Sequence, residues 1–202
     1  MERKEVIGVA SILFRLYLMR HGETAWSLSG QHTGRTDVPL TKQGEQEARK
    51  LSKRLRTVQF SRVFTSPLQR ARRTCELAGL DKIAEIEPDL TEWDYGDYEG
   101  ENSLDTRKNR PEWNLFRDGG PCGETPTQVS DRVDRLITRF RGLRGNIAIF
   151  SHGQVERVLA ARWIGLPVGQ AQRFVLNTAS VSILGYEHNL ANESAILQWN
   201  AG

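Results

Sequence analysis

The sequence predicts an α/β fold, a three-layer α/β/α sandwich built on a mainly parallel, doubly wound sheet. Short apolar runs without polar alternation, at 16–19 and within 146–153, are typical of strands covered on both faces. Segments with a helical period of apolar residues separate these runs. Strands that alternate with helices favour a parallel sheet with helices on both faces.

In the first half of the chain, strands and helices are expected to alternate. The expected elements are a strand at 16–19, a helix within 39–55, a strand at 61–66, a helix within 66–80 and a strand within 82–88. Thr41 is the expected N-cap of the first helix. In the second helix, Ser66 is expected to cap, Pro67 suits the first helical position, and Gly79 can end the helix.

The second half begins differently, because residues 92–124 are dense in Gly, acidic and aromatic residues, with Pro111 and Pro121 between them. We expect loops and short helices here, a lid-like insertion within a single domain of residues 1–202. The remaining expected elements are a helix at 125–143, a strand within 146–153, a helix at 154–166, and strands at 180–187 and 194–200.

Composition indicates a soluble, cytoplasmic protein, with 38% hydrophobic and 26% charged residues and a net charge of +3. Basic and acidic residues are interleaved, which disfavours nucleic acid as a partner. No window is apolar enough for a membrane span. Residues 1–15 favour an additional N-terminal segment, either packed on the domain or frayed, over a signal peptide. Cys75 and Cys122 lack metal-site spacing and are expected to be reduced thiols. Exposed strand edges in the tail permit a homodimer.

Two distant stretches, "LYLMRHG" and "NIAIFSHG", share one form: an apolar strand, a polar residue, His and Gly. His21 and His152 therefore both follow predicted strands. In open α/β sheets the working groups gather beyond the carboxyl ends of the strands. If the two strands are neighbours, the two imidazoles face one crevice, and the glycines that follow let the backbone turn closely.

Arginines accompany these histidines. Arg20 precedes His21, and Arg70 lies in the first turns of a predicted helix, whose N-terminus itself favours an anion. Guanidinium groups repel a divalent cation, so no metal site is expected. Two guanidiniums, two imidazoles and helix N-terminal amides instead suit a dianion such as phosphate.

These stretches, with "LMRHGETAW", "SPLQRARRT", "LTEWDYGDYEG" and "SHG" in this order, resemble the histidine phosphatase superfamily, which has the phosphoglycerate-mutase-like fold. The resemblance covers residues 16 to about 185 and implies that His21 is a nucleophile that becomes a phosphohistidine. It also implies that Arg20, Arg70 and His152 hold the phosphoryl oxygens, that Glu92 is the proton donor, and that Thr33 and Gly34 touch phosphate. No cofactor and no metal are implied.

The chemistry supports this interpretation. A covalent intermediate divides a slow hydrolysis into two easier displacements, and a neutral imidazole is a competent nucleophile near neutral pH. Its second nitrogen is then expected to donate to a backbone carbonyl of the following loop. Arginines can stabilise the transferring phosphoryl group without a metal, and Glu92 can protonate the leaving oxygen and later accept a proton from water.

The motifs leave two alternatives to a phosphatase open: a cofactor-dependent phosphoglycerate mutase and a non-catalytic module that binds a phosphorylated ligand. The mutases of this family have a longer insertion after the Glu motif and a longer tail. Ser27 also departs from the family, where Asn is frequent after the Trp, although Ser can still donate to phosphate. The resemblance is greatest to the acid-phosphatase and sugar-bisphosphatase branch, so a small phosphorylated metabolite is the expected substrate.

The substrate itself is not specified by the motifs. Arg107, Lys108 and Arg110 are candidates for a second anionic group, and a solvated charged loop is the alternative. Glu124 is expected either to bond near the site or to cap a helix. The aromatic residues considered for the pocket or for packing of the insertion are Trp93, Tyr95, Tyr98 and Trp113. The candidate binding residues are Arg20, Ser27, Thr33, Gly34, Arg70, Tyr95, His152 and Gly153. His32 and His188 are expected to be surface residues.

Overall fold

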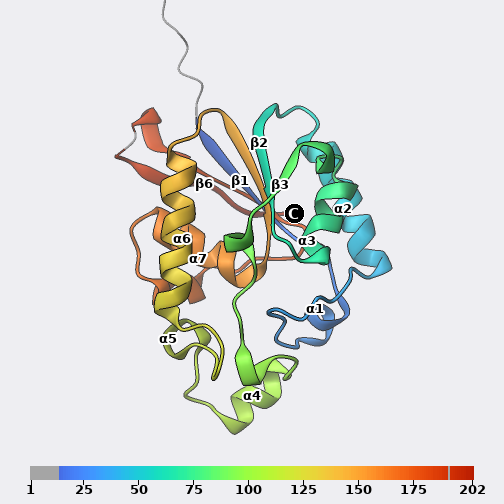
Figure 1. Ribbon diagram of the computed structural model, residues 1–202, viewed down its shortest axis with the longest axis vertical. Helices are drawn as coiled ribbons and strands as arrows, with labels where there is room; N and C mark the ends of the chain where they lie inside the picture. Colours follow the sequence, from blue (N-terminus) through green and yellow to red (C-terminus); the bar gives the residue numbers. More distant parts are fainter. Residues whose placement is uncertain (1–13, 191) are drawn as a thin grey trace, which may run out of the picture.

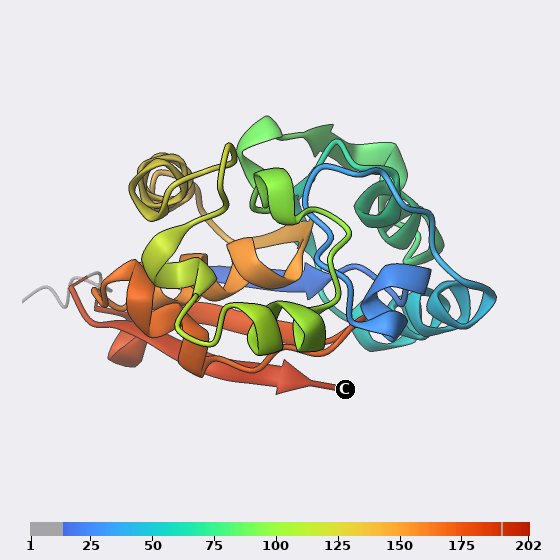
Figure 2. The ribbon, with the colours of Figure 1, turned by 90° about the horizontal axis from the view of Figure 1, so that it is seen from below.

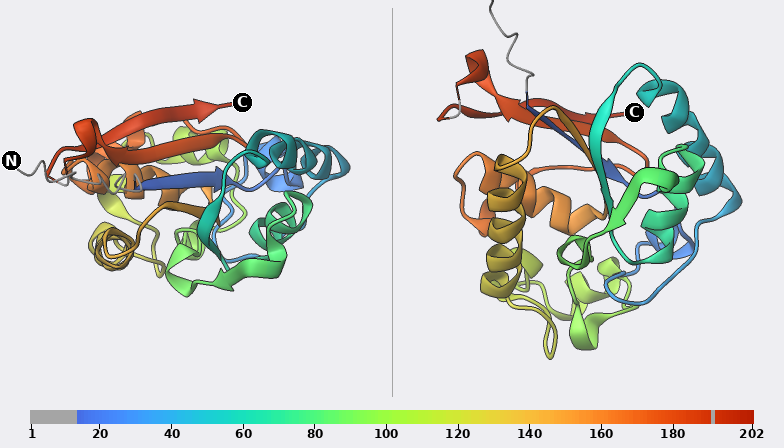
Figure 3. Two further views of the ribbon diagram at one scale, coloured as in Figure 1. Left: turned by 90° about the horizontal axis from the view of Figure 1, so that it is seen from above. Right: turned by 45° about the horizontal axis from the view of Figure 1, so that its top comes forward.

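Within the part of the chain that the structure describes, six strands form one sheet in the order β3-β2-β4-β1-β5-β6 (Figure 1). The computed structural model describes residues 14–190 and 192–202. The strands are β1 (Arg15–Arg20), β2 (Phe60–Thr65), β3 (Ala84–Ile86), β4 (Asn146–Ser151), β5 (Val181–Tyr186) and β6 (Ser194–Ala201). The first four strands in the spatial order are parallel, and β5 and β6 extend the sheet beyond β1 as antiparallel strands (Figure 3). The predicted α/β class with a mainly parallel sheet is confirmed.

Helices connect these strands. They are α1 (Ala25–Ser29), α2 (Lys42–Leu55), α3 (Gln69–Leu77), α4 (Ser103–Asn109), α5 (Leu115–Asp118), α6 (Pro126–Arg141) and α7 (Gly153–Trp163). Short 3₁₀ helices are η1 (Asp81–Ile83), η2 (Pro88–Leu90), η3 (Gly96–Tyr98), η4 (Val168–Arg173) and η5 (Glu187–Asn189). No helix within residues 14–190 and 192–202 has the length and hydropathy needed to cross a bilayer. The packing expected of the N-terminal segment concerns residues 1–13, which lie outside the described residues.

Both faces of the sheet are buried, as the apolar runs predict. Leu16 and Leu18 of β1 belong to a core shared with α6 and α7, whereas Tyr17 and Met19 belong to a second core shared with α2 and α3. Neighbouring residues of one strand point to opposite faces of a sheet. A continuous apolar run therefore supplies both cores, and β1 holds the residues that follow it on a buried strand.

The predicted start of α3 is wrong. Thr41 caps α2 as expected, accepting from the Gly44 amide at 2.9 Å. By contrast α3 begins at Gln69, its N-cap Leu68 makes no side-chain cap, and Ser66 lies two residues before that cap. The Ser66 hydroxyl accepts from the Leu68 amide at 3.3 Å and pairs with the His152 ring at 2.7 Å, so it serves a local turn and a tertiary contact before the helix begins.

Residues 92–124, hereafter the insertion, contain η3, α4 and α5. The insertion lies at the end of the molecule toward which β1 runs, together with α1 (Figure 1). Seen from below, α1 and α4 lie in front of the end of β1 (Figure 2). The insertion is thus placed over the carboxyl edge of the sheet, where the two histidine motifs end.

Candidate active site

The two histidine motifs meet at this edge. β1 and β4 are parallel neighbours, with Arg20 in register with Ser151, and the His21 amide donates to the Ser151 carbonyl at 3.0 Å. The imidazole centroids of His21 and His152 are 5.2 Å apart. The prediction that both rings lie at one edge of the sheet is confirmed. The expectation that both imidazoles face one crevice is not, because of the two only His21 lines the cavity there.

His21 has one ring nitrogen fixed and the other unoccupied. Its Nδ1 lies 2.8 Å from the Gly22 carbonyl oxygen, as the sequence predicts. A carbonyl only accepts, so Nδ1 carries the hydrogen and Nε2 keeps its lone pair. Nε2 has no hydrogen-bond partner among the described residues, and His21 lines a cavity of about 180 Å³. Burial, then Arg70 and Arg20, hold the His21 pKa well below its ordinary 6.5, which keeps the ring neutral.

His152 has both ring nitrogens occupied. Its Nδ1 accepts from Arg70 Nε at 3.1 Å, because a guanidinium can only donate. Its Nε2 is therefore the protonated nitrogen and donates to the Ser66 hydroxyl at 2.7 Å. Burial, then Arg70 and His21, lower the pKa of His152 well below 6.5. The His152 ring therefore holds Arg70 and Ser66 in place, and His152 is not among the described residues that line the cavity.

The two arginines show the same contrast: Arg20 lines the cavity with a nitrogen unoccupied, whereas Arg70 is buried and bonded to the protein. Arg20 lines the cavity, donates from Nη1 to the Leu176 carbonyl at 2.5 Å, and has no partner at Nε. Arg70 is fully buried and also donates to the backbone carbonyls of Thr36 and Gly34, at 2.9 and 2.8 Å. With the His152 contact, three of its five N–H groups serve the protein. Burial lowers the pKa of both guanidiniums, and Glu92 is the first group that opposes this shift in each.

Glu92 is buried and bound to the first turn of α7. Its Oε1 accepts from the amides of Trp93 and Val155, at 2.8 and 3.0 Å. Its Oε2 accepts from the Gln154 amide alone, at 2.9 Å. A carboxylate favours a helix N-terminus, where amide groups lack helical partners. The glutamate therefore reaches the cavity wall from the loop after η2, beside the helix that begins directly after His152.

An ion pair holds the loop that carries Glu92. Glu124 binds Arg132 of α6 through two contacts, at 2.8 and 3.0 Å, and accepts from the Asp94 amide at 3.0 Å. Glu124 thus forms hydrogen bonds near the site, which confirms the first of the two alternatives expected for it. The alternative that it caps a helix is wrong, because Thr125 is the N-cap of α6.

Among the residues expected to bind phosphate, Ser27, Thr33 and Tyr95 line the cavity with Arg20 and His21. The Ser27 hydroxyl also takes part in the capping box of α1, where it accepts from the Thr24 amide at 2.9 Å. The cavity wall thus contains hydroxyl groups, and one of them already has a structural partner.

The two glycines of the prediction lie against charged side chains. The Gly34 amide donates to Glu99 at 2.8 Å, so this N–H group is occupied. At Gly153 a β-carbon would come within 3.3 Å of the Arg20 guanidinium. Absence of a side chain at Gly153 therefore lets Arg20 pack against the start of α7.

His32 lines the cavity, although the sequence indicated a surface residue. Its ring stacks on Tyr95 with centroids 4.8 Å apart, and its Nε2 is buried without a partner. Burial lowers the pKa of His32 below 6.5. The available signal was its position directly before Thr33 and Gly34, in the loop already assigned to the phosphate. His188 is exposed, as expected, and pairs with Glu193.

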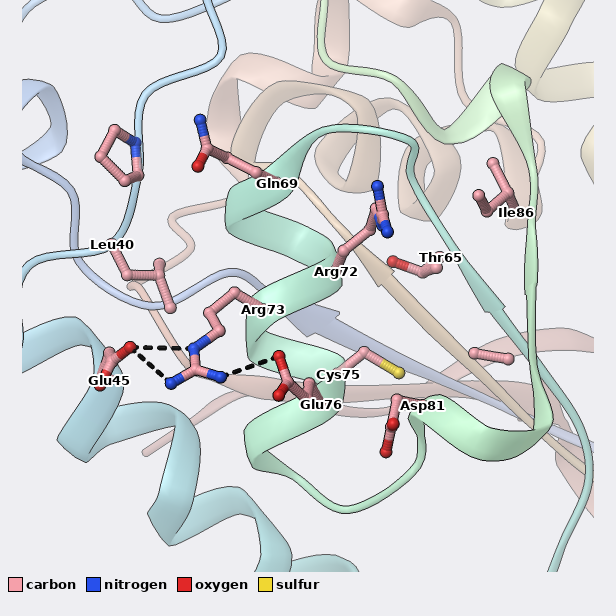
Figure 4. Close-up of a pocket in the computed structure, with 12 residues that line it drawn as sticks. Leu40, Glu45, Thr65, Gln69, Arg72, Arg73, Cys75, Glu76, Asp81 and Ile86 are labelled. Atoms are coloured by element: carbon pink, nitrogen blue, oxygen red, sulfur yellow. Dashed lines mark hydrogen bonds and ion pairs between the residues drawn. The ribbon is translucent and has the colours of Figure 1, made fainter.

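A second, larger hollow of about 710 Å³ lies against α3 and contains neither motif histidine (Figure 4). Its thiol, Cys75, is buried, and burial raises its pKa to about 12. A thiol that stays protonated is a weak nucleophile. Cys75 and Cys122 are both free, and the described residues contain no group of three or more His, Cys, Asp or Glu arranged for a metal ion. The reactive groups thus gather at the sheet edge.

Comparison with known proteins identifies the family of this chain. A family model described as the histidine phosphatase superfamily (branch 1) matches residues 16–201. An acid phosphatase of Mycobacterium tuberculosis is 39% identical over 87% of this chain and 88% of its own. A sedoheptulose 1,7-bisphosphatase of Saccharomyces cerevisiae is 38% identical over 78% of this chain and 70% of its own. Other relatives are named as phosphoglycerate mutases.

A solved structure from Mycobacterium tuberculosis superimposes with a TM-score of 0.88 at 36% identity, over 93% of this chain and 97% of the other. The fold, the motif order and the family match therefore agree. The chain belongs to the histidine phosphatase superfamily.

Proposed function

We propose that the protein is a metal-independent phosphomonoesterase that acts on a small phosphorylated metabolite through a phosphohistidine on His21. The observation that carries this proposal is the unoccupied Nε2 of a neutral His21 on the wall of a cavity that Arg20 also lines. A nucleophile needs an available lone pair, and the transferring phosphoryl group needs positive charge beside it.

In the first step, the Nε2 lone pair forms a bond to phosphorus while the bond from phosphorus to the leaving oxygen breaks. Arg20 stabilises the charge on the equatorial oxygens of the phosphoryl group. Protonated Glu92 gives its proton to the leaving oxygen, which departs as an alcohol. Oε2 is the suitable oxygen, because it accepts one amide hydrogen whereas Oε1 accepts two.

In the second step, water attacks phosphorus and the phosphorus–nitrogen bond breaks. Glu92 takes the water proton and returns to its starting state, and His21 regains its lone pair. The products are the alcohol and inorganic phosphate, so atoms and protons balance without a metal ion.

Two considerations favour hydrolysis over isomerisation. The insertion spans only residues 92–124 before α6 begins, and a short insertion leaves more room for water than one that encloses a bisphosphorylated cofactor. In addition, the relatives that are 39% and 38% identical to this chain are named as an acid phosphatase and a sedoheptulose 1,7-bisphosphatase.

The test is hydrolysis of p-nitrophenyl phosphate with EDTA present, from about pH 5 to 8, combined with rapid quenching and intact mass measurement. We expect turnover that persists in EDTA and a transient increase equal to the mass of one phosphoryl group. His21→Ala is expected to abolish both signals. His188→Ala is the matched control, because that histidine is exposed, pairs with Glu193 and is not among the residues that line the cavity.

Three outcomes would overturn the proposal. Wild-type protein that binds orthovanadate but releases no nitrophenol would indicate a binding module. Loss of turnover in EDTA would indicate a required metal. Isomerisation of 3-phosphoglycerate, with bisphosphoglycerate present, faster than its hydrolysis would indicate a mutase.

A further inference from the structure

The cavity at His21 adjoins a second one, which is lined partly by residues of the insertion. We call the first the histidine chamber and the second, of about 280 Å³, the insertion chamber. The residues that line both are His32, Tyr95, Ser103, Gln154 and Arg157. Glu92 lies on the wall of the histidine chamber. A leaving group that it protonates can therefore extend past the five shared residues toward the insertion chamber.

The insertion chamber is positively charged. Among the described residues its lining contains two guanidiniums, Arg107 and Arg157, and no carboxylate. Arg157 donates to the Ala171 and Gln172 carbonyls and to the Gln154 side chain, at 3.2, 2.7 and 2.8 Å, all neutral oxygens. Its charge is thus held in place by the protein without an opposing carboxylate in contact.

Only one of the three candidate cations in the insertion reaches this chamber. Arg110 binds Glu101 at 2.9 Å and lies over the Tyr98 ring, 4.3 Å from its centroid. Lys108 is 3.7 Å from its helix neighbour Asp105. The Arg107 side chain lines the chamber and has no ion-pair or hydrogen-bond partner in the described part of the chain.

We propose that the insertion chamber is a subsite for a second anionic group, and that Arg107 is its specificity-determining residue. This inference rests on the proposed phosphatase function. The substrate class is then a phosphomonoester whose leaving group carries a further phosphate or a carboxylate. A positive pocket whose described lining contains no carboxylate attracts such a group, whereas a neutral leaving group gains nothing from its charge.

Two matched pairs of substrates test the charge and its source. Fructose 1,6-bisphosphate is compared with its two monophosphates, and 3-phosphoglycerate is compared with glycerol 3-phosphate. We expect the more anionic member of at least one pair to be preferred by about tenfold in kcat/KM. The first pair responds to a second phosphate and the second pair to a carboxylate.

Arg107→Gln is expected to remove most of that preference, a loss of about five- to tenfold in kcat/KM for the more anionic substrate. Turnover of p-nitrophenyl phosphate is expected to stay within about twofold, because its leaving group has no second anion. Lys108→Gln is the matched control, since it removes the same charge from the next residue of α4, and it should keep the preference.

Absence of a preference in both pairs, an equal loss for both members of a pair, or the same loss in Lys108→Gln would overturn the subsite. The proposed function fails separately, when the wild type does not hydrolyse p-nitrophenyl phosphate. In that case calorimetry of fructose 1,6-bisphosphate with His21→Ala, with and without Arg107→Gln, still decides the subsite. Binding weakened by Arg107→Gln supports it, and unchanged binding overturns it.

Discussion

The ends of β1 and β4 share one sequence pattern, a polar residue followed by His and Gly, but their histidines make different contacts. At the end of β1, Arg20 and His21 keep unoccupied nitrogens and line the histidine chamber. At the end of β4, His152 uses both ring nitrogens, one for Arg70 and one for Ser66. Both residues are buried, with exposed fractions of 4% for His21 and 0% for His152, and both rings are neutral, so neither burial nor charge distinguishes them.

Hydrogen-bond partners separate them instead. A carbonyl at Nδ1 leaves His21 with a lone pair at Nε2, whereas a guanidinium at Nδ1 of His152 makes Nε2 a donor that Ser66 already accepts. The first ring is available for chemistry and the second orients its surroundings. Residues at matching positions of one sheet edge can therefore take the roles of nucleophile and anchor.

The largest expected effects come from replacing the two histidines, and they test directly which one is the nucleophile. We expect His21→Ala to lower kcat at least about 10³-fold and to remove the phosphoenzyme. We expect His152→Ala to lower kcat about 10²-fold and to lower the free energy of unfolding by about 1–3 kcal/mol, because buried groups of Arg70 and Ser66 lose their partner. Rapid-quench mass measurement and urea unfolding check both. A phosphoenzyme in His21→Ala that is absent in His152→Ala would reverse the assignment.

Glu92 is bound to the first turn of the helix that follows His152, and we propose that it donates a proton in the reaction at His21. Substitution of Glu92 tests that role. We expect Glu92→Gln to lower kcat/KM for glycerol 3-phosphate about 10²-fold and for p-nitrophenyl phosphate less than about tenfold. Nitrophenolate departs without a proton, whereas an alkoxide needs one. Equal losses for the two substrates would show that Glu92 positions groups rather than donating a proton.

A pH titration of stability tests what the two histidines share. Both have pKa values well below 6.5 in the folded protein, so the unfolded chain binds more protons between that lowered pKa and 6.5. The free energy of unfolding should therefore fall as the pH falls through this interval, by up to about 1.4 kcal/mol per pH unit for each histidine. Urea unfolding at about pH 7 and about pH 5 measures it, and His152→Gln should remove the contribution of that residue, up to about 1.4 kcal/mol per pH unit. An unchanged slope would mean that His152 is charged in the folded protein.

Much of this arrangement is predictable from sequence, because a strand end fixes where its next residue lies. The positions of Arg20 and His21 at a strand end follow from the apolar run before them. That β1 and β4 are neighbours is left open by the sequence, and the structure supplies it. The role of Ser66 does not follow, because a Ser-Pro pair equally favours a helix start, and only the tertiary contact with His152 decides. His32 was missed because its stacking partner, Tyr95, is distant in the sequence.

Ser27 gives the smallest expected effect and defines how far the nucleophile side extends. Its hydroxyl accepts from the Thr24 amide at 2.9 Å and donates to the Thr24 carbonyl at 3.0 Å, so its hydrogen already has an acceptor. If Ser27 only caps α1, Ser27→Ala lowers the free energy of unfolding by about 0.5–1 kcal/mol and changes KM less than about twofold. If phosphate displaces the Thr24 carbonyl as acceptor, KM for p-nitrophenyl phosphate rises about tenfold. The capping box already occupies this hydroxyl, so we expect the first result, and a tenfold rise would place Ser27 with Arg20 and His21 among the groups that face the phosphate.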